Sequence, residues 1–125
     1  MLSLDRTPLA KEGLMLKEAL DIMDRFKLGI VCVVDKDLKL IGVITDGDIR
    51  RTLLTIQKPL SSILVDDLKN YYIINPITIN YDSTLISSID LMGEKQIWDL
   101  PVTDKSNSLL GLLHLHSAIS AILKD

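Results

Sequence analysis

The segment GVITDGDIRR, residues 42–51, holds the side chains of this chain that are best suited to chemistry. A hydroxyl, two carboxylates and two guanidinium groups follow a short apolar run, on Thr45, Asp46, Asp48, Arg50 and Arg51. Thr45 and Asp48 have the spacing of a capping box, in which each side chain accepts a backbone N–H group at the start of a helix. Asp46 and Gly47 suit a tight junction between a strand and a helix. This interpretation needs no ligand.

The same arrangement also suits an anionic ligand that carries a sugar. A helix that starts directly after a strand presents N–H groups to a phosphate, and a nearby carboxylate can accept hydrogen bonds from ribose hydroxyls. Arg50 and Arg51 would then be phosphate donors, although arginines on a helix are often only solvated. The residues alone leave capping and ligand binding open.

Length, composition and charge limit the classes of protein to consider. The chain has 125 residues, 47% hydrophobic and 25% charged, which predicts one compact domain or two small repeats. A net charge of −3 gives no reason to expect nucleic acid or a membrane surface as partner. No apolar stretch approaches the ~20 residues of a membrane span and no signal-peptide pattern is present, so we expect a cytoplasmic location. Cys32 lies in an apolar run and is expected to be a buried structural thiol.

The sequence matches itself when it is shifted by 69 positions. This offset brings eight identical pairs together: Leu16 and Leu85, Asp21 and Asp90, Met23 and Met92, Val33 and Val102, Asp35 and Asp104, Lys36 and Lys105, Leu40 and Leu109, and Gly42 and Gly111. A single offset over so many positions indicates a duplicated unit, which fixes the architecture.

Each unit has the pattern β-α-β-β-α. An extended piece (7–11 or 75–81) precedes an amphipathic helix (16–26 or 85–92), because apolar residues there recur at helical spacing. Two apolar runs joined by a polar turn predict a hairpin over 30–44 and again over 100–113. Closing helices are expected at about 46–56 and 117–123. We therefore divide the chain into repeat 1 (1–56), a connecting segment (57–75) with a short helix around 62–69, and repeat 2 (76–125).

The duplicated β-α-β-β-α unit, with GVIT-x-x-D at the end of the second hairpin strand, resembles a tandem pair of CBS domains over nearly the whole chain. The resemblance implies an α/β fold of two repeats related by pseudo-two-fold symmetry, acting as a regulatory module that binds a nucleotide. It implies that Thr45 and Asp48 hold the phosphate and ribose, that Asp46 and Gly47 shape the turn, and that Arg50 and Arg51 are secondary contacts. The two strands and the extended piece would supply an apolar pocket for the base.

More narrowly, the chain is similar to the C-terminal CBS pair of bacterial arabinose-5-phosphate isomerases, which serve Kdo and lipopolysaccharide synthesis. Five segments in this order carry the similarity: KLGIVCVVD, GVITDGDIRRTL, NPITI, LPVTD and GLLHLHSAI. That similarity implies an attached sugar-isomerase domain, no catalytic residue in this chain, and CMP-Kdo as ligand, with adenine nucleotides as the alternative. The similarity also implies that the module needs no cofactor and that it forms a homodimer through the helices of the CBS domains. The CBS pair of sugar nucleotidyltransferases shares the TDGDIRR block and stays an alternative, as does a structural oligomerisation module without ligand.

The second repeat departs from this pattern. Thr45 aligns with His114 and Asp48 with Ser117, where isomerase-like chains read H-x-H-D, so we expect one competent site per chain or a composite site. His114 and His116 are expected to contact a polar part of the ligand or to cap the helix. A zinc site lacks further ligands at suitable spacing, so no metal is expected.

Aromatic residues are few, and we expect them to pack. Trp98, next to the first strand of the second hairpin, is expected to be half-buried, with base stacking as the alternative. Tyr71 and Tyr72 are expected to pack in the connecting segment. No Ser-His-Asp or Cys-His arrangement and no glycine-rich phosphate loop is present, so the sequence predicts no catalysis.

Overall fold

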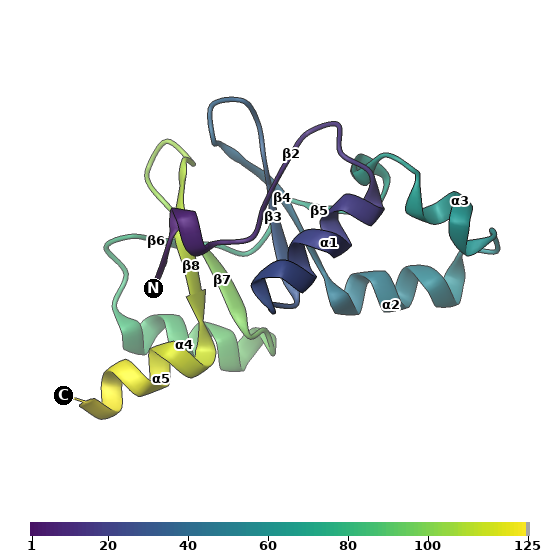
Figure 1. The fold of residues 1–125 in the computed structure, drawn as a ribbon. Helices are drawn as coiled ribbons and strands as arrows, with labels where there is room; N and C mark the ends of the chain where they lie inside the picture. Colours follow the sequence, from purple (N-terminus) through teal and green to yellow (C-terminus); the bar gives the residue numbers. More distant parts are fainter. Residues whose placement is uncertain (125) are drawn as a thin grey trace. The chain divides into compact units, whose positions relative to one another are not determined.

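The computed structural model describes residues 1–124, which form two compact units (Figure 1). The first-repeat unit is Pro8–Pro76, and the second-repeat unit joins Met1–Thr7 to Ile77–Asp125. Each unit contains a four-stranded sheet and its own helices, so the expected α/β class and the two repeats are confirmed. Residues 57–75, between the repeats in sequence, pack within the first-repeat unit.

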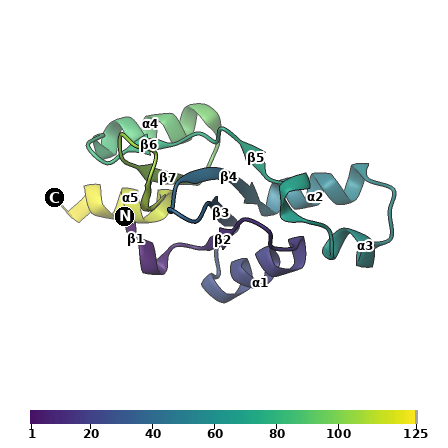
Figure 2. The same cartoon turned by 90° about the horizontal axis from the view of Figure 1, so that it is seen from above.

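The sheet of the first-repeat unit has the strand order β2-β3-β4-β5. Its strands are β2 (Leu9–Lys11), β3 (Ile30–Val34), β4 (Leu40–Thr45) and β5 (Ile73–Ile74), and its helices are α1 (Leu16–Phe26), α2 (Asp46–Thr55), α3 (Leu60–Leu64) and the 3-10 helix η2 (Leu68–Asn70). β2 runs parallel to β3, as a connection through α1 requires, and β3 forms an antiparallel hairpin with β4. Figure 2 shows α1 beside β2 and β3, and α2 continuing from the end of β4.

The core of this unit lies between α1 and the sheet. All five residues of β3 are buried, as the unbroken apolar run predicts. In β4 buried residues alternate with half-buried ones, so Ile44 lies in the core while its neighbour Thr45 is available at the surface. Cys32 is completely buried, which confirms the structural thiol.

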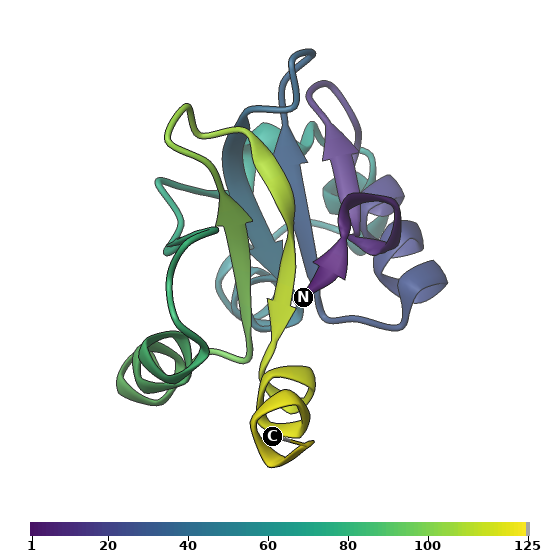
Figure 3. The ribbon, with the colours of Figure 1, turned by 90° about the vertical axis from the view of Figure 1, so that its left-hand side faces the viewer.

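The second-repeat unit repeats this order with the sheet β1-β8-β7-β6. Its strands are β1 (Leu2–Ser3), β6 (Ile79–Asn80), β7 (Asp99–Thr103) and β8 (Leu109–His114), and its helices are the 3-10 helix η1 (Leu4–Arg6), α4 (Leu85–Lys95) and α5 (Leu115–Lys124). Figure 3 shows β7 and β8 side by side, with β1 along the other edge of β8. A core that includes Met92, Leu100 and Leu113 joins α4 to the sheet.

The hairpin turns of the two repeats make the same hydrogen bonds at positions 69 residues apart. Oδ1 of Asp35 accepts the N–H groups of Asp37 and Lys39, at 2.8 and 3.0 Å. Oδ1 of Asp104 accepts those of Ser106 and Ser108, both at 2.9 Å. Each strand pair also shifts register at the same place, between residues 33 and 34 and between 102 and 103. The sparse identities in the sequence therefore record a real structural repeat.

Two glycines at equivalent positions allow the edge strands of the two sheets to approach closely enough to pair. A Cβ on Gly111 would lie 2.2 Å from the carbonyl oxygen of Leu2, and one on Gly42 would lie 2.7 Å from that of Ile73. β1 therefore pairs with β8, and β5 with β4, only because a side chain is absent there. Each edge strand comes from the segment that precedes the other repeat.

Two helix boundaries differ from the sequence prediction. The helix expected around 62–69 ends at Leu64, because Asp66 and Leu68 instead bond the backbone of Leu16 and Leu14. The closing helix expected at 117–123 spans Leu115–Lys124. It begins directly after β8 because the N–H of Leu115 donates to the carbonyl oxygen of Trp98, as Asp46 does to Gly29 in the other unit.

Candidate functional site

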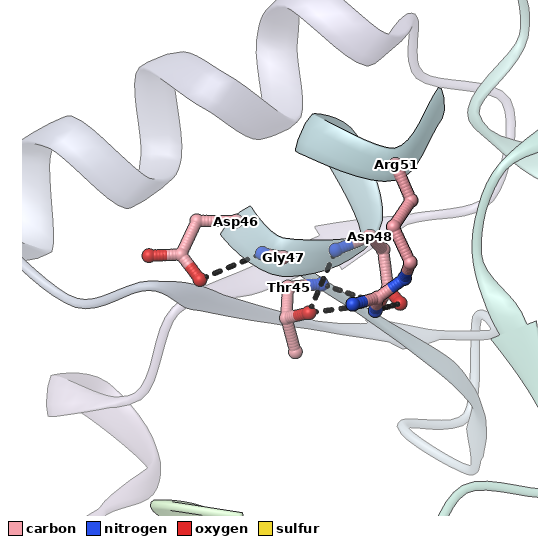
Figure 4. Close-up of polar contacts among 5 residues, drawn as sticks. All are labelled: Thr45, Asp46, Gly47, Asp48 and Arg51. Carbon is pink, nitrogen blue, oxygen red and sulfur yellow. Dashed lines mark hydrogen bonds and ion pairs between the residues drawn. The ribbon is translucent and has the colours of Figure 1, made fainter. Parts of the chain in front are cut away.

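Thr45 is the last residue of β4 and the N-cap of α2, so the chain passes from strand to helix without a loop. Its backbone is extended, with φ −115° and ψ 164°, which lets the hydroxyl turn back over the first helical turn. The side chains of the TDGD segment therefore gather at one end of the sheet (Figure 4).

Thr45 and Asp48 form the capping box that their spacing predicts. The Thr45 hydroxyl accepts the N–H of Asp48 at 3.1 Å and donates to Oδ2 of Asp48 at 2.9 Å. The same Oδ2 accepts the N–H of Thr45 at 2.9 Å. Because two of these bonds satisfy backbone N–H groups that the helix start leaves without a partner, those of Thr45 and Asp48, the capping interpretation is confirmed.

Asp48 keeps one unused acceptor position. An ionised carboxylate offers about four lone-pair sites. Two of those sites accept from Thr45, and Oδ1 accepts from Nη2 of Arg51 at 2.6 Å. The Asp48 side chain is only 14% exposed, whereas that of Arg51 is 62% exposed. The site thus combines a rigidly held carboxylate with a cation that can move into solvent.

Asp46 and Gly47 complete the junction on the other side. Oδ1 of Asp46 accepts the N–H of Gly47 at 2.8 Å, and Figure 4 shows Asp46 pointing away from Asp48 and Arg51. A Cβ on Gly29 would lie 2.6 Å from Oδ2 of Asp46, so glycine leaves room for this carboxylate. The N–H groups of Gly47 and Asp48 are therefore already bonded to side chains.

Arg50 lies apart from this network. It is exposed on α2, and within residues 1–124 its side chain makes no hydrogen bond or ion pair. Arg50 is next to Arg51 in sequence, yet only Arg51 reaches Asp48.

The second-repeat unit has the same junction with different side chains. His114 ends β8, and its Nδ1 lies 2.7 Å from Oδ1 of Asp99, the first residue of β7. His116 is exposed in the first turn of α5. Sequence reasoning found both histidines but missed Asp99. The strand register would have indicated it, because residues 99 and 114 pair as residues 30 and 45 do.

A hollow of about 590 Å³ lies elsewhere in the first-repeat unit. Its lining includes Val33 and Ile41, near the hairpin turn, together with Glu12 and Tyr72. Thr45 and Asp48 are not part of the lining, because they lie at the opposite end of β4.

Among the aromatic residues, one expectation is wrong. Trp98 is 64% exposed, not half-buried, because its neighbour Ile97 takes the place in the core. Tyr71 is buried in the core of the first-repeat unit and Tyr72 packs against that core, as expected.

The described part of the chain contains neither a cluster of metal-ligating side chains nor a helix that could span a membrane. Within residues 1–124, no three His, Cys, Asp or Glu side chains gather closely enough to hold a metal ion. None of the helices in that range is both long and apolar enough to cross a membrane.

The profile of the CBS domain matches residues 6–55 and 65–124, one match for each repeat. The chain belongs to the CBS domain family. The resemblance to a tandem CBS pair is thereby confirmed, and the TDGD junction of the first CBS domain has the geometry described above.

Several curated relatives contain a segment similar to this chain. An uncharacterized protein of Rickettsia prowazekii is 34% identical over 122 residues, 96% of this chain and 35% of that protein. Inosine-5'-monophosphate dehydrogenase of Aquifex aeolicus is 32% identical over 110 residues (87% and 21%), and a probable arabinose 5-phosphate isomerase of Haemophilus influenzae is 32% identical over 100 residues (80% and 28%). The chain spans about a third of the length of the first of these relatives, or less of the others.

Solved structures agree with the fold. CBSX2 of Arabidopsis thaliana, crystallised in complex with AMP, aligns with a TM-score of 0.86 at 22% identity, covering 99% of this chain and 92% of its own. The CBS domain pair of protein MJ0100, in complex with 5-methylthioadenosine and S-adenosyl-L-methionine, aligns with a TM-score of 0.77 at 23% identity, covering 94% and 88%.

Proposed function

We propose that this CBS pair is a regulatory module that binds a nucleotide or nucleotide sugar, with the Thr45–Asp48 junction as its main contact. The observation that carries the proposal is the Asp48 carboxylate, which the capping box orients and which keeps one acceptor position. A ribose hydroxyl is a donor that fits this position.

The phosphate contacts follow from the same geometry. Asp46 and Asp48 put two negative charges in the first turn of α2, which opposes a phosphate at the backbone N–H groups. The phosphate therefore has to meet the arginines. Arg51 is mostly exposed and can leave Asp48 for a phosphate oxygen, and Arg50 has no bond to break. In the second repeat, His114 and His116 are the polar groups left for the ligand.

Two ligand classes compete. The solved relatives CBSX2 and MJ0100 were crystallised with adenosine compounds, which supports an adenine nucleotide. The similarity to a probable arabinose 5-phosphate isomerase supports CMP-Kdo, the end product of the route that such an enzyme would serve. A ribose and an anionic group are common to both classes, and Asp48 and the arginines would contact these shared groups.

The parent protein is the second part of the proposal. We infer an arabinose-5-phosphate isomerase in which this module follows a sugar-isomerase domain in a cytoplasmic enzyme. Ligand occupancy would change activity by stabilising one of two arrangements of the enzyme. The similarity to inosine-5'-monophosphate dehydrogenase supports another parent, so expression of the full-length gene and assay of both reactions would decide.

The third part of the proposal is a homodimer that forms through the closing helices α2 and α5. Leu53 and Leu54 of α2 are 48% and 79% exposed, and Leu123 of α5 is 79% exposed. Apolar side chains on these helices would lose exposed area against a second copy. If this were the module's only role, the TDGD junction would be a plain helix cap and no nucleotide would bind.

A thermal-shift panel tests the proposal. The panel contains CMP-Kdo, CMP, AMP, ATP and S-adenosylmethionine. A ligand at about a hundred times its dissociation constant should stabilise the folded chain by about 2.7 kcal/mol, which is several degrees. The Thr45→Ala/Asp48→Ala double variant should lose this shift, whereas Asp24→Asn, which removes a carboxylate from an exposed ion pair on α1, should keep it. If no compound raises the midpoint of the natural chain, the structural role takes precedence.

A further inference from the structure

The second-repeat unit holds a carboxylate–imidazole pair at a place where the first repeat has none. Asp99 and His114 are directly opposite each other on β7 and β8, and the equivalent residues of the first repeat are Ile30 and Thr45. The Asp99 side chain is 13% exposed and that of His114 is 32% exposed. A carboxylate so far removed from water needs a strong donor, and the imidazole N–H is one.

This pair determines which nitrogen of His114 faces a ligand. An ionised carboxylate only accepts hydrogen bonds, so the nitrogen at 2.7 Å from Asp99, Nδ1, must carry the hydrogen. The bond at one ring nitrogen sets the state of the other. Nε2 is then the nitrogen left for a ligand, and within residues 1–124 it makes no hydrogen bond or ion pair with the protein.

Other titratable groups near β8 do not reach the ring. The elements packed against β8 are β7, β1, η1 and α5. Besides Asp99, their titratable or charged side chains are Asp5 and Arg6 on η1 and His116 and Lys124 on α5. Of the described carboxylates, Asp99 alone lies within ion-pair distance of the His114 ring.

We propose that Asp99 is a positioning residue that holds His114 in its neutral Nδ1–H form, so that Nε2 accepts a hydrogen bond from a hydroxyl group of the ligand. This inference rests on the proposed function, since it needs a ligand that carries a sugar hydroxyl.

The tautomer of His114 tests the role of Asp99 without any ligand. Long-range ¹H–¹⁵N NMR spectra of the full chain at alkaline pH distinguish the two neutral forms of each histidine. We expect the Nδ1–H form for His114 in the natural chain and in Asp99→Asn, whose amide oxygen accepts the same hydrogen, and its loss in Asp99→Ala. The exposed ring of His116 is the internal control and should not change. An Nε2–H form of His114 in the natural chain overturns the proposal.

Titration calorimetry with CMP-Kdo and with AMP tests the effect on binding. For a probe that binds the natural chain, Asp99→Ala should weaken binding about tenfold, the lower end of the range known for the outer partners of metal-ligating histidines. Asp90→Asn removes a carboxylate from the exposed face of α4 and should leave the affinity unchanged. Unchanged affinity in Asp99→Ala overturns the proposal. If neither probe binds the natural chain, the proposed function fails for both, and the tautomer still decides the role of Asp99.

Discussion

Replacing Thr45 by alanine should destabilise the chain by about 1 kcal/mol, the usual contribution of an N-cap side chain. The substitution removes two bonds, one to the N–H of Asp48 at 3.1 Å and one to its carboxylate at 2.9 Å. The bond from the Thr45 N–H to Asp48 remains, so the loss should not reach the value for a whole capping network. In a chain of this length, 1 kcal/mol corresponds to a fall of roughly 3–5 °C in the melting temperature.

Asp48→Ala should have an effect of similar size, because it removes the other half of the box together with an ion pair to Arg51. That pair contributes at most about 1 kcal/mol, since the arginine is largely exposed. The double variant should lose less than the sum of the single losses, by about 0.5–1 kcal/mol, because both changes remove the same hydroxyl–carboxylate bond.

Urea unfolding followed by circular dichroism measures these values, with Thr45→Ser as the matched control. Serine keeps the hydroxyl and should stay within about 0.5 kcal/mol of the natural chain. Equal losses in Thr45→Ser and Thr45→Ala would refute the reasoning, because the hydroxyl would then contribute nothing.

Three further outcomes follow from the structure. Gly111→Ala should destabilise the chain by about 1–3 kcal/mol by forcing β1 away from β8, whereas Gly93→Ala, in open space on α4, should stabilise it by about 0.5–1 kcal/mol; urea unfolding measures both. The hydrogen bond to Asp66 raises the pKa of Tyr71 to about 12, and Tyr71 and Lys58 lower the pKa of Asp66 below 3.8. The natural chain should therefore be more stable than Tyr71→Phe by the largest amount at neutral pH. The difference in unfolding free energy should decrease in acid, because Asp66 is protonated there, and above pH 10, because Tyr71 ionises. A difference that stays constant across this pH range would contradict the assignment of the bond. Cys32 should react with a thiol reagent only as fast as the protein unfolds, and rapid labelling of the native protein would disprove its burial.

The sequence predicts much of the fold because the pattern is local and present twice. The apolar run of β3 and the periodicity of α1 each indicate one type of element, and the shared offset arranges them into equal units. The helix after Leu60 is predicted too long, because long-range backbone bonds from Asp66 and Leu68 end it. No local pattern could predict that β1 pairs with β8 across more than a hundred residues.

The residues of the candidate site also differ in whether a local sequence pattern predicts them. Thr45 and Asp48 are found from their spacing because a capping box lies within four consecutive residues. Asp99 is missed because its partner is fifteen residues away on the facing strand, and only the register brings the two together. Arg50 and Arg51 are neighbouring arginines that the sequence alone does not distinguish, and only the structure shows that Arg51 reaches Asp48.

The most direct test of the central claim is a titration of the ¹⁵N-labelled chain with AMP and with CMP-Kdo, followed through the backbone amide resonances. If the first repeat binds the nucleotide, the resonances of Gly29, Gly47 and Asp48 should shift in a saturable way with at least one of the two compounds. If all three stay in place at millimolar concentrations of both, the Thr45–Asp48 junction is a helix cap and not the nucleotide site.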